Sequence, residues 1–390
     1  MNFWQKLKKD KGAGDTYASG NPEAQNSEPI LVLAPMADVT DRAFRQIIAK
    51  YGKPDVMWTE FVSADGLMLG GRETLINDLA FSESERPIVA QFFTSKPEMM
   101  RKAAELAMEL GFDGVDINMG CPDKSVEKQG AGAALIKNPK LAQEIILAAM
   151  DGAKKDGKNL PVSVKTRIGY NKNELETWLP ALLETNPAMV TIHCRTRKEM
   201  SDVPARWEHV KRAVEIRDEF QKKVGKGSEA KGTLIPFGQD TYAEGNPEAR
   251  KNCKTLIFGN GDVADLADAR QKARETGCDG VMFGRAIFGN PWLFSGRPKN
   301  EISIEEKLKV LVEHTRLFEK LVQPKPPVGQ GKSFAVMKKH FKAYVTGWDG
   351  AKELRAKLME CENADEVEKI IRSAAERPDA DVAFALSHTI

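Results

Sequence analysis

Short apolar segments rich in β-branched residues recur along this chain and are separated by stretches with helical periodicity. The segments do not alternate polar and apolar residues, as is typical of strands covered on both faces in a parallel sheet. Amphipathic stretches such as residues 96–110, 138–155 and 205–223 lie between them. The pattern predicts eight strands, at residues 30–34, 55–59, 88–92, 114–118, 162–167, 189–194, 255–259 and 280–284.

The number and order of these segments favour an α/β fold, a (β/α)8 TIM barrel over residues 30–299. About 255 residues separate the first strand's start from the last strand's end, a length that suits eight βα units. A doubly wound open sheet is the alternative. That fold would be expected to carry a glycine-rich turn after its first strand, and the sequence there is Leu-Ala-Pro-Met-Ala at residues 33–37.

The barrel is expected to be followed by a small all-α C-terminal domain over residues 300–390. A helix-like segment at 304–322 is interrupted by Pro-Lys-Pro-Pro-Val-Gly at 324–329, and residues 332–390 have helical periodicity without strand signals. Residues 1–29 form an N-terminal extension, in which too few apolar residues occur for a signal peptide.

Charge is unevenly distributed in the predicted helical domain. The whole chain has a formal net charge of +2, so any attraction to nucleic acid must come from a local patch. Residues 307–357 carry 12 Lys or Arg against 4 Asp or Glu, net +8, and residues 358–390 carry 3 against 8, net −5. A solvated helix face is the alternative interpretation. The basic block places cations around Tyr344, namely Lys338, Lys339, His340 and Lys342, as candidate RNA contacts.

The segment Asp-Ile-Asn-Met-Gly-Cys-Pro, residues 116–122, holds a thiol at the end of a predicted strand. Gly120 permits a tight bend and Pro122 fixes φ just after Cys121. The alternative is that Cys121 is a small buried hydrophobe, as most free cysteines are. The five cysteines are scattered without a Cys-x-x-Cys motif. This spacing argues against disulfides and structural zinc and is typical of a reducing cytoplasm. No apolar run approaches the roughly 18 residues of a membrane span.

Polar residues gather where the predicted strands end. Active sites of TIM barrels lie at the carboxyl ends of the strands, so these side chains are expected to share one site. They are Gln91, Asn118, Lys165, Arg167, His193 and Arg195.

The last two predicted strands end in glycine-containing turns. The seventh runs into Gly259-Asn260-Gly261-Asp262 and the eighth into Gly284-Arg285. Glycines let backbone N–H groups approach an anion, and the corresponding loops of barrels frequently hold a phosphate. Asp262 is expected to cap the following helix, and Arg285 to add a bidentate donor. Two tight βα turns without a ligand are the alternative.

Flavin mononucleotide (FMN) combines a phosphate with a planar ring whose reduced form develops negative charge at one edge. Lys165 could stabilise that charge, and His193 could hydrogen-bond the same edge. Gln91 could meet the ring's amide system. Cys121 would then face the substrate, and its thiol, with an unperturbed pKa near 8.5, could act as a general acid. Further ring contacts are expected from Pro35 and Met36.

With these residues in view, the chain resembles the tRNA-dihydrouridine synthases. The resemblance implies an FMN-dependent reduction of uridine in tRNA, in which NADPH or NADH reduces the flavin, flavin N5 passes a hydride to uracil C6, and Cys121 protonates C5. The matching motifs are LAPMADVTDRAFR (33–45), DINMGCP (116–122), VKTR (164–167), IHCRTR (192–197), GNGDV (259–263), VMFGRAIFGNPWLF (281–294) and MKKHFKAY (337–344).

The same resemblance implies roles for individual residues. Asn118 would lie beside flavin and uracil, while Arg167, Arg195 and Arg197 would lie near the substrate. Two positions depart from the family pattern, Asp38 and Cys194, each where glycine is common. The FMN contacts implied are Pro35, Met36, Gln91, Lys165, His193, Asn260, Gly261, Asp262, Gly284 and Arg285.

The expected partners are tRNA and a nicotinamide cofactor, with no membrane and no metal, and a monomer is expected. Two other functions stay open at this point. One is an FMN oxidoreductase of the dihydroorotate or enoate type, against which the basic helical segment argues. The other is a flavin-free RNA-binding barrel, against which the presence of Cys121, Lys165 and His193 argues.

An internal repeat has no chemical interpretation. Asp-Thr-Tyr-Ala-Ser-Gly-Asn-Pro-Glu-Ala at 15–24 recurs with one difference at 240–249, inside a polar insertion at 225–252. Both copies are rich in turn residues, which predicts loops.

Overall fold

The computed structural model describes residues 2–12, 28–226, 255–323 and 331–375, and both copies of the repeat lie outside these ranges. Eight parallel strands form one sheet in the order β1-β10-β9-β8-β7-β4-β3-β2. They are β1 (Ile30–Leu33), β2 (Met57–Ser63), β3 (Ile88–Phe93), β4 (Gly114–Met119), β7 (Val162–Arg167), β8 (Met189–His193), β9 (Leu256–Asn260) and β10 (Gly280–Phe283).

The two edge strands of this sheet meet and close it into a barrel. A parallel bridge joins Val32 to Val56. On either side of it, the Asp55 N–H donates to the Leu31 carbonyl at 2.9 Å, and the Leu33 N–H donates to the Val56 carbonyl at 3.2 Å. The prediction of a TIM barrel with eight strands is therefore confirmed, and the doubly wound sheet is excluded.

One predicted strand is displaced. Residues 55–59 were expected, whereas β2 runs from Met57 to Ser63 and its pairing with β3 shifts register between Trp58 and Phe61. Glu60 is charged and interrupts the apolar run, so a search for hydrophobic segments does not predict this part of the strand, although Glu60 itself is buried. Asp55 precedes the strand, and its carboxylate accepts the Leu31 N–H at 2.7 Å.

Alternate residues of the strands fill the barrel interior. Ile30 and Val32 of β1 point inward, while Leu31 and Leu33 pack outward against the helices, so one strand contributes to two apolar layers. The interior cluster consists of Trp4, Ile30, Val32, Ala34, Val56, Trp58, Val89, Met189, Leu256, Phe258 and Met282.

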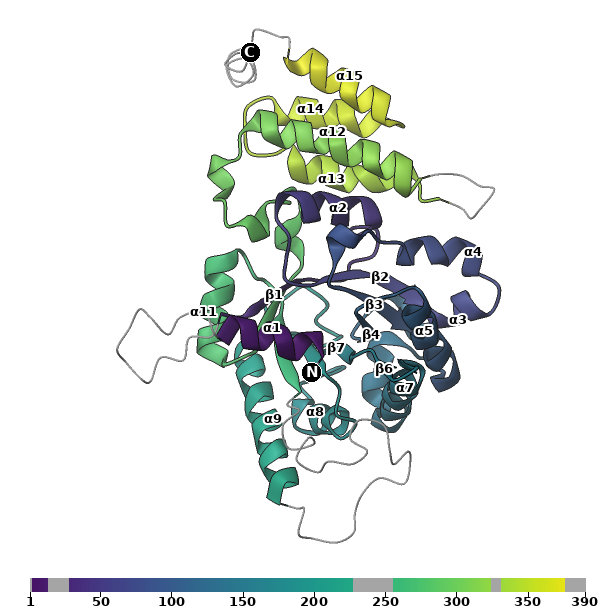
Figure 1. Ribbon diagram of the computed structural model, residues 1–390. Coiled ribbons are helices and arrows are strands. Elements are labelled where there is room, and N and C mark those ends of the chain that lie inside the picture. Colours follow the sequence, from purple (N-terminus) through teal and green to yellow (C-terminus); the bar gives the residue numbers. More distant parts are fainter. Residues whose placement is uncertain (1, 13–27, 227–254, 324–330, 376–390) are drawn as a thin grey trace.

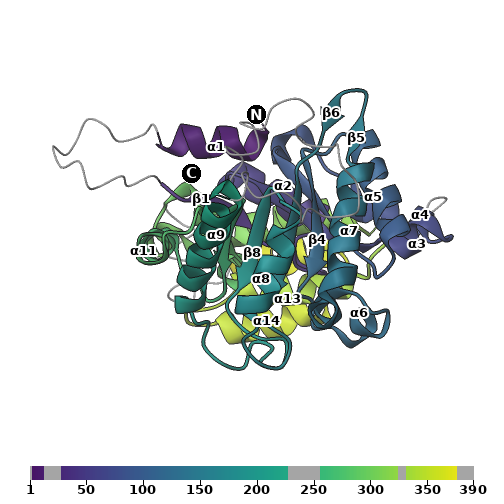
Figure 2. The ribbon, with the colours of Figure 1, turned by 90° about the horizontal axis from the view of Figure 1, so that it is seen from below.

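The helices surround the barrel (Figures 1 and 2). The predicted stretches 96–110, 138–155 and 205–223 appear as α5, α7 and α9, and proline occupies the first turn of both α5 and α7. A small hairpin, β5 (Lys154–Lys155) and β6 (Lys158–Asn159), follows α7. The helices of this region are α2 (Arg42–Tyr51), α3 (Ala64–Met68), α4 (Arg72–Leu75), α5 (Pro97–Glu109), α6 (Lys124–Lys128), α7 (Pro139–Gly152), α8 (Leu175–Leu183), α9 (Glu208–Lys226) and α11 (Leu266–Thr276).

A helix in the N-terminal extension, α1 (Phe3–Gly12), closes one end of the barrel. Trp4 is 1% exposed, and its ring centroid lies 5.7 Å from that of Trp58 and 5.6 Å from that of Phe258. Lys8 pairs with Asp279, just before β10, so α1 lies at the amino ends of the strands. At the opposite end, the carboxyl ends of the strands lead into the loops that form the active sites of barrels.

Four helices after the barrel pack against one another, and the first two of them contact α2 (Figure 1): α12 (Ile304–Leu321), α13 (Met337–Tyr344), α14 (Ala351–Glu360) and α15 (Ala364–Ala375). We call them the C-terminal helices. The ring of Phe44 on α2 lies 4.9 Å from that of His314 on α12 and 4.8 Å from that of His340 on α13. Among the described residues, no helix has both the length and the apolar character needed to cross a membrane.

Candidate active site

The polar residues at the strand ends lie side by side. In the sheet register, Asn118 of β4 is opposite Lys165 of β7, Arg167 of β7 is opposite His193 of β8, and His193 is opposite Asn260 of β9. The parallel topology therefore brings residues that are more than 140 positions apart in sequence to one end of the barrel.

A hydrogen-bonded chain leads from the barrel interior to the turn that carries Cys121. Gln91 Nε2 donates to Asp116 Oδ2 at 2.6 Å, and Asn118 Nδ2 donates to Gln91 Oε1 at 3.1 Å. Asn118 Oδ1 then accepts the N–H groups of Gly120 at 3.1 Å and Cys121 at 2.9 Å. The Asn118 side chain thus supplies an acceptor to two backbone N–H groups of the turn, which have left the strand ladder, as asparagine often does.

Electrostatics differ between the two central groups of this site. Burial raises the pKa of the Cys121 thiol, so the thiol is protonated at neutral pH. Burial and the neighbouring charge of Arg167 lower the pKa of Lys165 to about 8, although Asp116 and Cys121 oppose this shift. Asn118 accepts the Cys121 N–H and lies opposite Lys165 in the register of β4 and β7, so Cys121 and Lys165 occupy the same end of the barrel.

His193 is a neutral imidazole among cations. Burial lowers its pKa well below the usual value, and the charges of Lys165, Arg167, Arg195 and Arg285 lower it further. Arg195 Nη1 lies 3.1 Å from His193 Nε2. Because Arg can only donate, Nε2 is the acceptor and the ring proton resides on Nδ1.

Asp262 anchors the loops instead of capping a helix. Its carboxylate accepts from Arg195, from Arg285 Nη2 at 2.5 Å, and from the Ala205 N–H at 2.9 Å. The expectation that Asp262 caps the following helix is wrong, because the cap of α11 is Asp265, which accepts the Asp268 N–H. The side chain of Arg285 remains 65% exposed despite this contact.

The two glycines at the carboxyl end of β9, one in its last two residues and one just after it, have different physical roles. A Cβ on Gly259 would lie 2.2 Å from the ring of Trp207, so this glycine makes room for a side chain of the protein and not for a ligand. Gly261 has φ of +123°, a conformation that side chains disfavour, and its carbonyl accepts Trp207 Nε1–H at 2.8 Å. At the end of β10, a Cβ on Gly284 would meet only Met36 Sδ, at 3.9 Å.

The arginines expected near substrate are held by the protein itself. Arg167 is 6% exposed and donates to the carbonyls of Gly120, Thr196 and Met200. Arg195 is 2% exposed. Arg197 pairs with Glu127 of α6 through both carboxylate oxygens. These contacts fix the loops around Cys121.

On α13, the cations and the aromatics separate onto two faces. Lys339 and Lys342 are exposed and Lys338 is half-buried. His340 is fully buried against Phe44 and His314, and Tyr344 is 1% exposed. Contrary to the expectation, the structure does not present His340 or Tyr344 to an RNA, because the apolar side of the amphipathic helix contains both.

Sequence reasoning missed several residues that organise this end of the barrel. Burial raises the pKa of Asp116 to about 6, against the hydrogen bonds from Ser163 and Gln91. Its signal was a carboxylate inside a strand pattern, two residues before Asn118. Glu60 on β2 is 3% exposed and carries the same signal, within the sequence Trp-Thr-Glu-Phe.

Comparisons with known proteins follow the motifs. The family model described as Dihydrouridine synthase (Dus) matches residues 32–221 and 247–378. A probable tRNA-dihydrouridine synthase of Staphylococcus aureus (strain COL) is 37% identical over 360 residues, 92% of this chain and 97% of that protein. Probable tRNA-dihydrouridine synthase 2 of Bacillus subtilis (strain 168) is 37% identical over 345 residues, 88% and 93% of the two chains. The chain therefore belongs to the dihydrouridine synthase family of enzymes.

Proposed function

We propose that this protein is an FMN-dependent enzyme that reduces uridine in tRNA to 5,6-dihydrouridine with NADPH or NADH. The observation that carries the proposal is the arrangement of a thiol, Cys121, and a cation, Lys165, at the same end of the barrel, where Asn118 accepts the Cys121 N–H and lies opposite Lys165 in the sheet register. Family membership supports tRNA as the substrate and a flavin as the cofactor.

The residues at the strand ends fit a planar, anionic cofactor. Lys165 is a half-buried cation beside the neutral His193, and neighbouring arginines add positive charge, so an anionic group gains electrostatic stabilisation there. The exposed side chain of Arg285 suits a phosphate. We assign FMN binding to Pro35, Met36, Gln91, Lys165, His193, Asn260, Gly261, Asp262, Gly284 and Arg285.

Bound and reduced FMN would supply a hydride to uracil C6. Cys121 then gives its thiol proton to C5, a role that requires the thiol form that burial favours. Asn118 holds the turn on which Cys121 lies. Together with Arg167, Arg195 and Arg197, it fixes the conformation of the loops on the substrate side of the site.

Exposed lysines of α13 suit an RNA backbone. Lys339 and Lys342 are exposed and Lys338 is half-buried on the face opposite to the buried aromatics. We assign them to tRNA phosphates, and a uridine would have to leave its stack to reach the barrel end.

The test is a reaction of unmodified tRNA with protein, FMN and NADPH, followed by mass spectrometry of the nucleosides. Wild-type protein should form dihydrouridine, whereas Cys121→Ala should keep flavin binding and lose nearly all product. Cys278→Ala is the matched control, since Cys278 is a buried thiol that precedes β10 at the opposite end of the barrel. Full product from Cys121→Ala would contradict the assignment, and turnover of free uridine without tRNA would favour a small-molecule substrate.

A further inference from the structure

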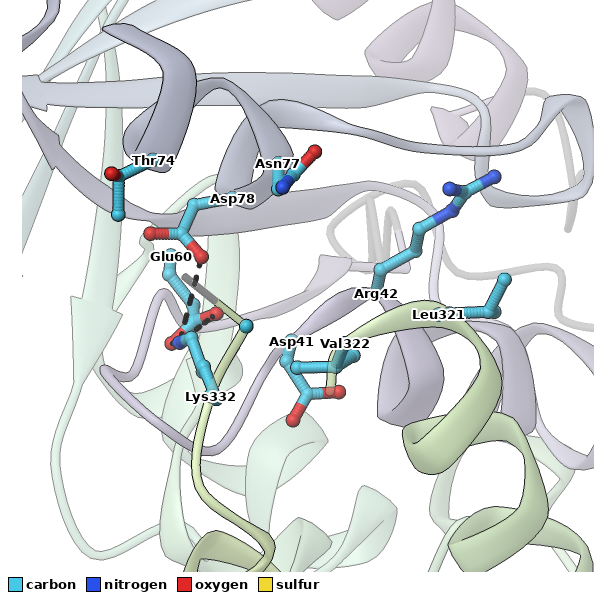
Figure 3. Close-up of a pocket in the computed structure, with 10 residues that line it drawn as sticks. Asp41, Arg42, Glu60, Thr74, Asn77, Asp78, Leu321, Val322 and Lys332 are labelled. Atoms are coloured by element: carbon cyan, nitrogen blue, oxygen red, sulfur yellow. Dashed lines mark hydrogen bonds and ion pairs between the residues drawn. The ribbon is translucent and has the colours of Figure 1, made fainter. Parts of the chain in front are cut away.

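Lys332 links the segment between two of the C-terminal helices to the active end of the barrel. Lys332 lies between α12 and α13 in sequence, and its Nζ is 2.7 and 2.8 Å from the two carboxylate oxygens of Glu60. The same Nζ is 3.2 Å from Asp38 Oδ1 and 3.6 Å from Asp78 Oδ1. Lys332, Glu60 and Asp78 border a cavity of about 220 Å³ between the barrel and α12, which Val322 also lines (Figure 3).

The ion pair between Lys332 and Glu60 is largely withdrawn from water. The side chain of Glu60 is 4% exposed and that of Lys332 is 20% exposed. Burial raises the pKa of Glu60 to about 7, against the opposing charge of Lys332. Although burial disfavours the ammonium, the carboxylates of Glu60, Asp78 and Asp38 raise the pKa of Lys332. Each charge therefore depends on the other.

Glu60 also forms a hydrogen bond with the turn after β1. Its Oε1, which receives Lys332, also accepts the Asp38 N–H at 2.5 Å. Asp38 has φ of +55°, a conformation that favours glycine, so this turn relies on tertiary contacts to hold it. Within the same turn the Met36 N–H donates to Thr40 Oγ1 at 3.0 Å, and Met36 Sδ lies near Gly284.

We propose that Lys332 is a positioning residue that couples the C-terminal helices to the cofactor site, by holding Glu60 against the turn that carries Pro35 and Met36. The proposal rests on the proposed function, which assigns these two residues to FMN. Through this contact, packing of the C-terminal helices against the barrel favours cofactor binding. By linkage, cofactor binding favours the same packing of the helices, which carry the RNA-facing lysines.

The main experiment compares Lys332→Met with Lys50→Met. Lys50 on α2 pairs with Glu313 on α12 at 2.7 Å, so the control also removes an ion pair between barrel and C-terminal helices but does not contact the turn. FMN affinity of the flavin-free proteins is measured by fluorescence titration without tRNA. We expect Lys332→Met to weaken FMN binding by about fivefold or more, the lower range of coupling between sites. Lys50→Met should stay within about twofold of wild type, and Lys332→Arg should restore most of the affinity.

A second measurement needs no cofactor. Amide hydrogen exchange of residues 36–40 should accelerate in flavin-free Lys332→Met and not in Lys50→Met, because only the first change releases Glu60 from the Asp38 N–H. Glu60→Gln serves the same purpose if Lys332→Met does not fold.

Three results would overturn the inference: unchanged FMN affinity in Lys332→Met, unchanged exchange in the turn, or equal effects of Lys332→Met and Lys50→Met. Wild-type protein that binds no FMN would overturn the proposed function and, with it, the coupling to the cofactor. If the wild-type protein binds FMN and Lys332→Met binds it equally well, the proposed function stands and only the coupling is overturned.

Discussion

Replacing Asn118 by alanine should both destabilise the protein and release the turn that holds Cys121. The side chain of Asn118 makes three hydrogen bonds, to Gln91 Oε1 and to the N–H groups of Gly120 and Cys121, and it is 6% exposed. Each buried hydrogen bond contributes about 1 kcal/mol net, so the free energy of unfolding should fall by about 3 kcal/mol.

Asn138→Ala provides the matched control. Asn138 also accepts a backbone N–H, that of Leu141 at 3.2 Å, but it caps α7 on the outside of the barrel. One exposed capping bond should cost about 1 kcal/mol, and nothing at the barrel end should change.

Two assays distinguish a loss of protein stability from a displacement of Cys121. Urea titration followed by circular dichroism gives the free energy of unfolding of each variant. Iodoacetamide labelling, quantified peptide by peptide, reports access to Cys121, whereas the thiols of Cys194, Cys278 and Cys361 are buried. Labelling of Cys121 should accelerate several-fold in Asn118→Ala and stay unchanged in Asn138→Ala. A loss below about 1 kcal/mol together with unchanged labelling in Asn118→Ala would refute the role of this side chain.

Three other outcomes are expected. The pKa of Lys165, about 8, predicts that FMN affinity falls as pH rises from 7 to 9, and fluorescence titration should find no such fall in Lys165→Met. Burial lowers the pKa of His340 to about 3. The unfolded chain therefore binds a proton below pH 6.5 that the folded protein excludes, and stability is lost as pH falls from 6.5 toward 3. His340→Phe should reduce the loss between pH 7 and pH 5, measured in urea, by about 2 kcal/mol, and an unchanged loss would contradict the burial argument. Alanine at the three lysines of α13 should reduce the slope of log K for tRNA against log salt by up to about 3, and an equal slope would exclude phosphate contacts by Lys338, Lys339 and Lys342.

The strands and the membership of the site could be predicted because both follow from local patterns. A run such as Gly114–Met119 is apolar enough to identify itself, and parallel strands of a barrel all end on the same side. The sequence therefore predicts that Gln91, Asn118, Lys165 and His193 share one end of the barrel. Gly259 also belongs to a local pattern, but the space that its missing side chain leaves is occupied by the ring of Trp207, which no local pattern predicts.

Contacts between distant segments were not predictable from such patterns. A histidine at the centre of the basic segment of α13 has the same local surroundings whether it faces water or Phe44, and only the packing of α13 against α2 makes it a core residue. Likewise, Trp4 could not be recognised as the residue that fills the barrel's amino end, because its partners Trp58 and Phe258 lie in two separate strands.

The eightfold alternation of strand and helix and the chemical character of the strand ends follow from residues that are neighbours in the chain, so both can be predicted from local patterns. The pairing of charges depends on how distant segments pack: Lys332 pairs with Glu60, 272 residues away, and Arg195 pairs with Asp262, 67 residues away. A charged side chain needs a partner once it leaves water, and the partner's identity depends on how the barrel closes and where the C-terminal helices pack.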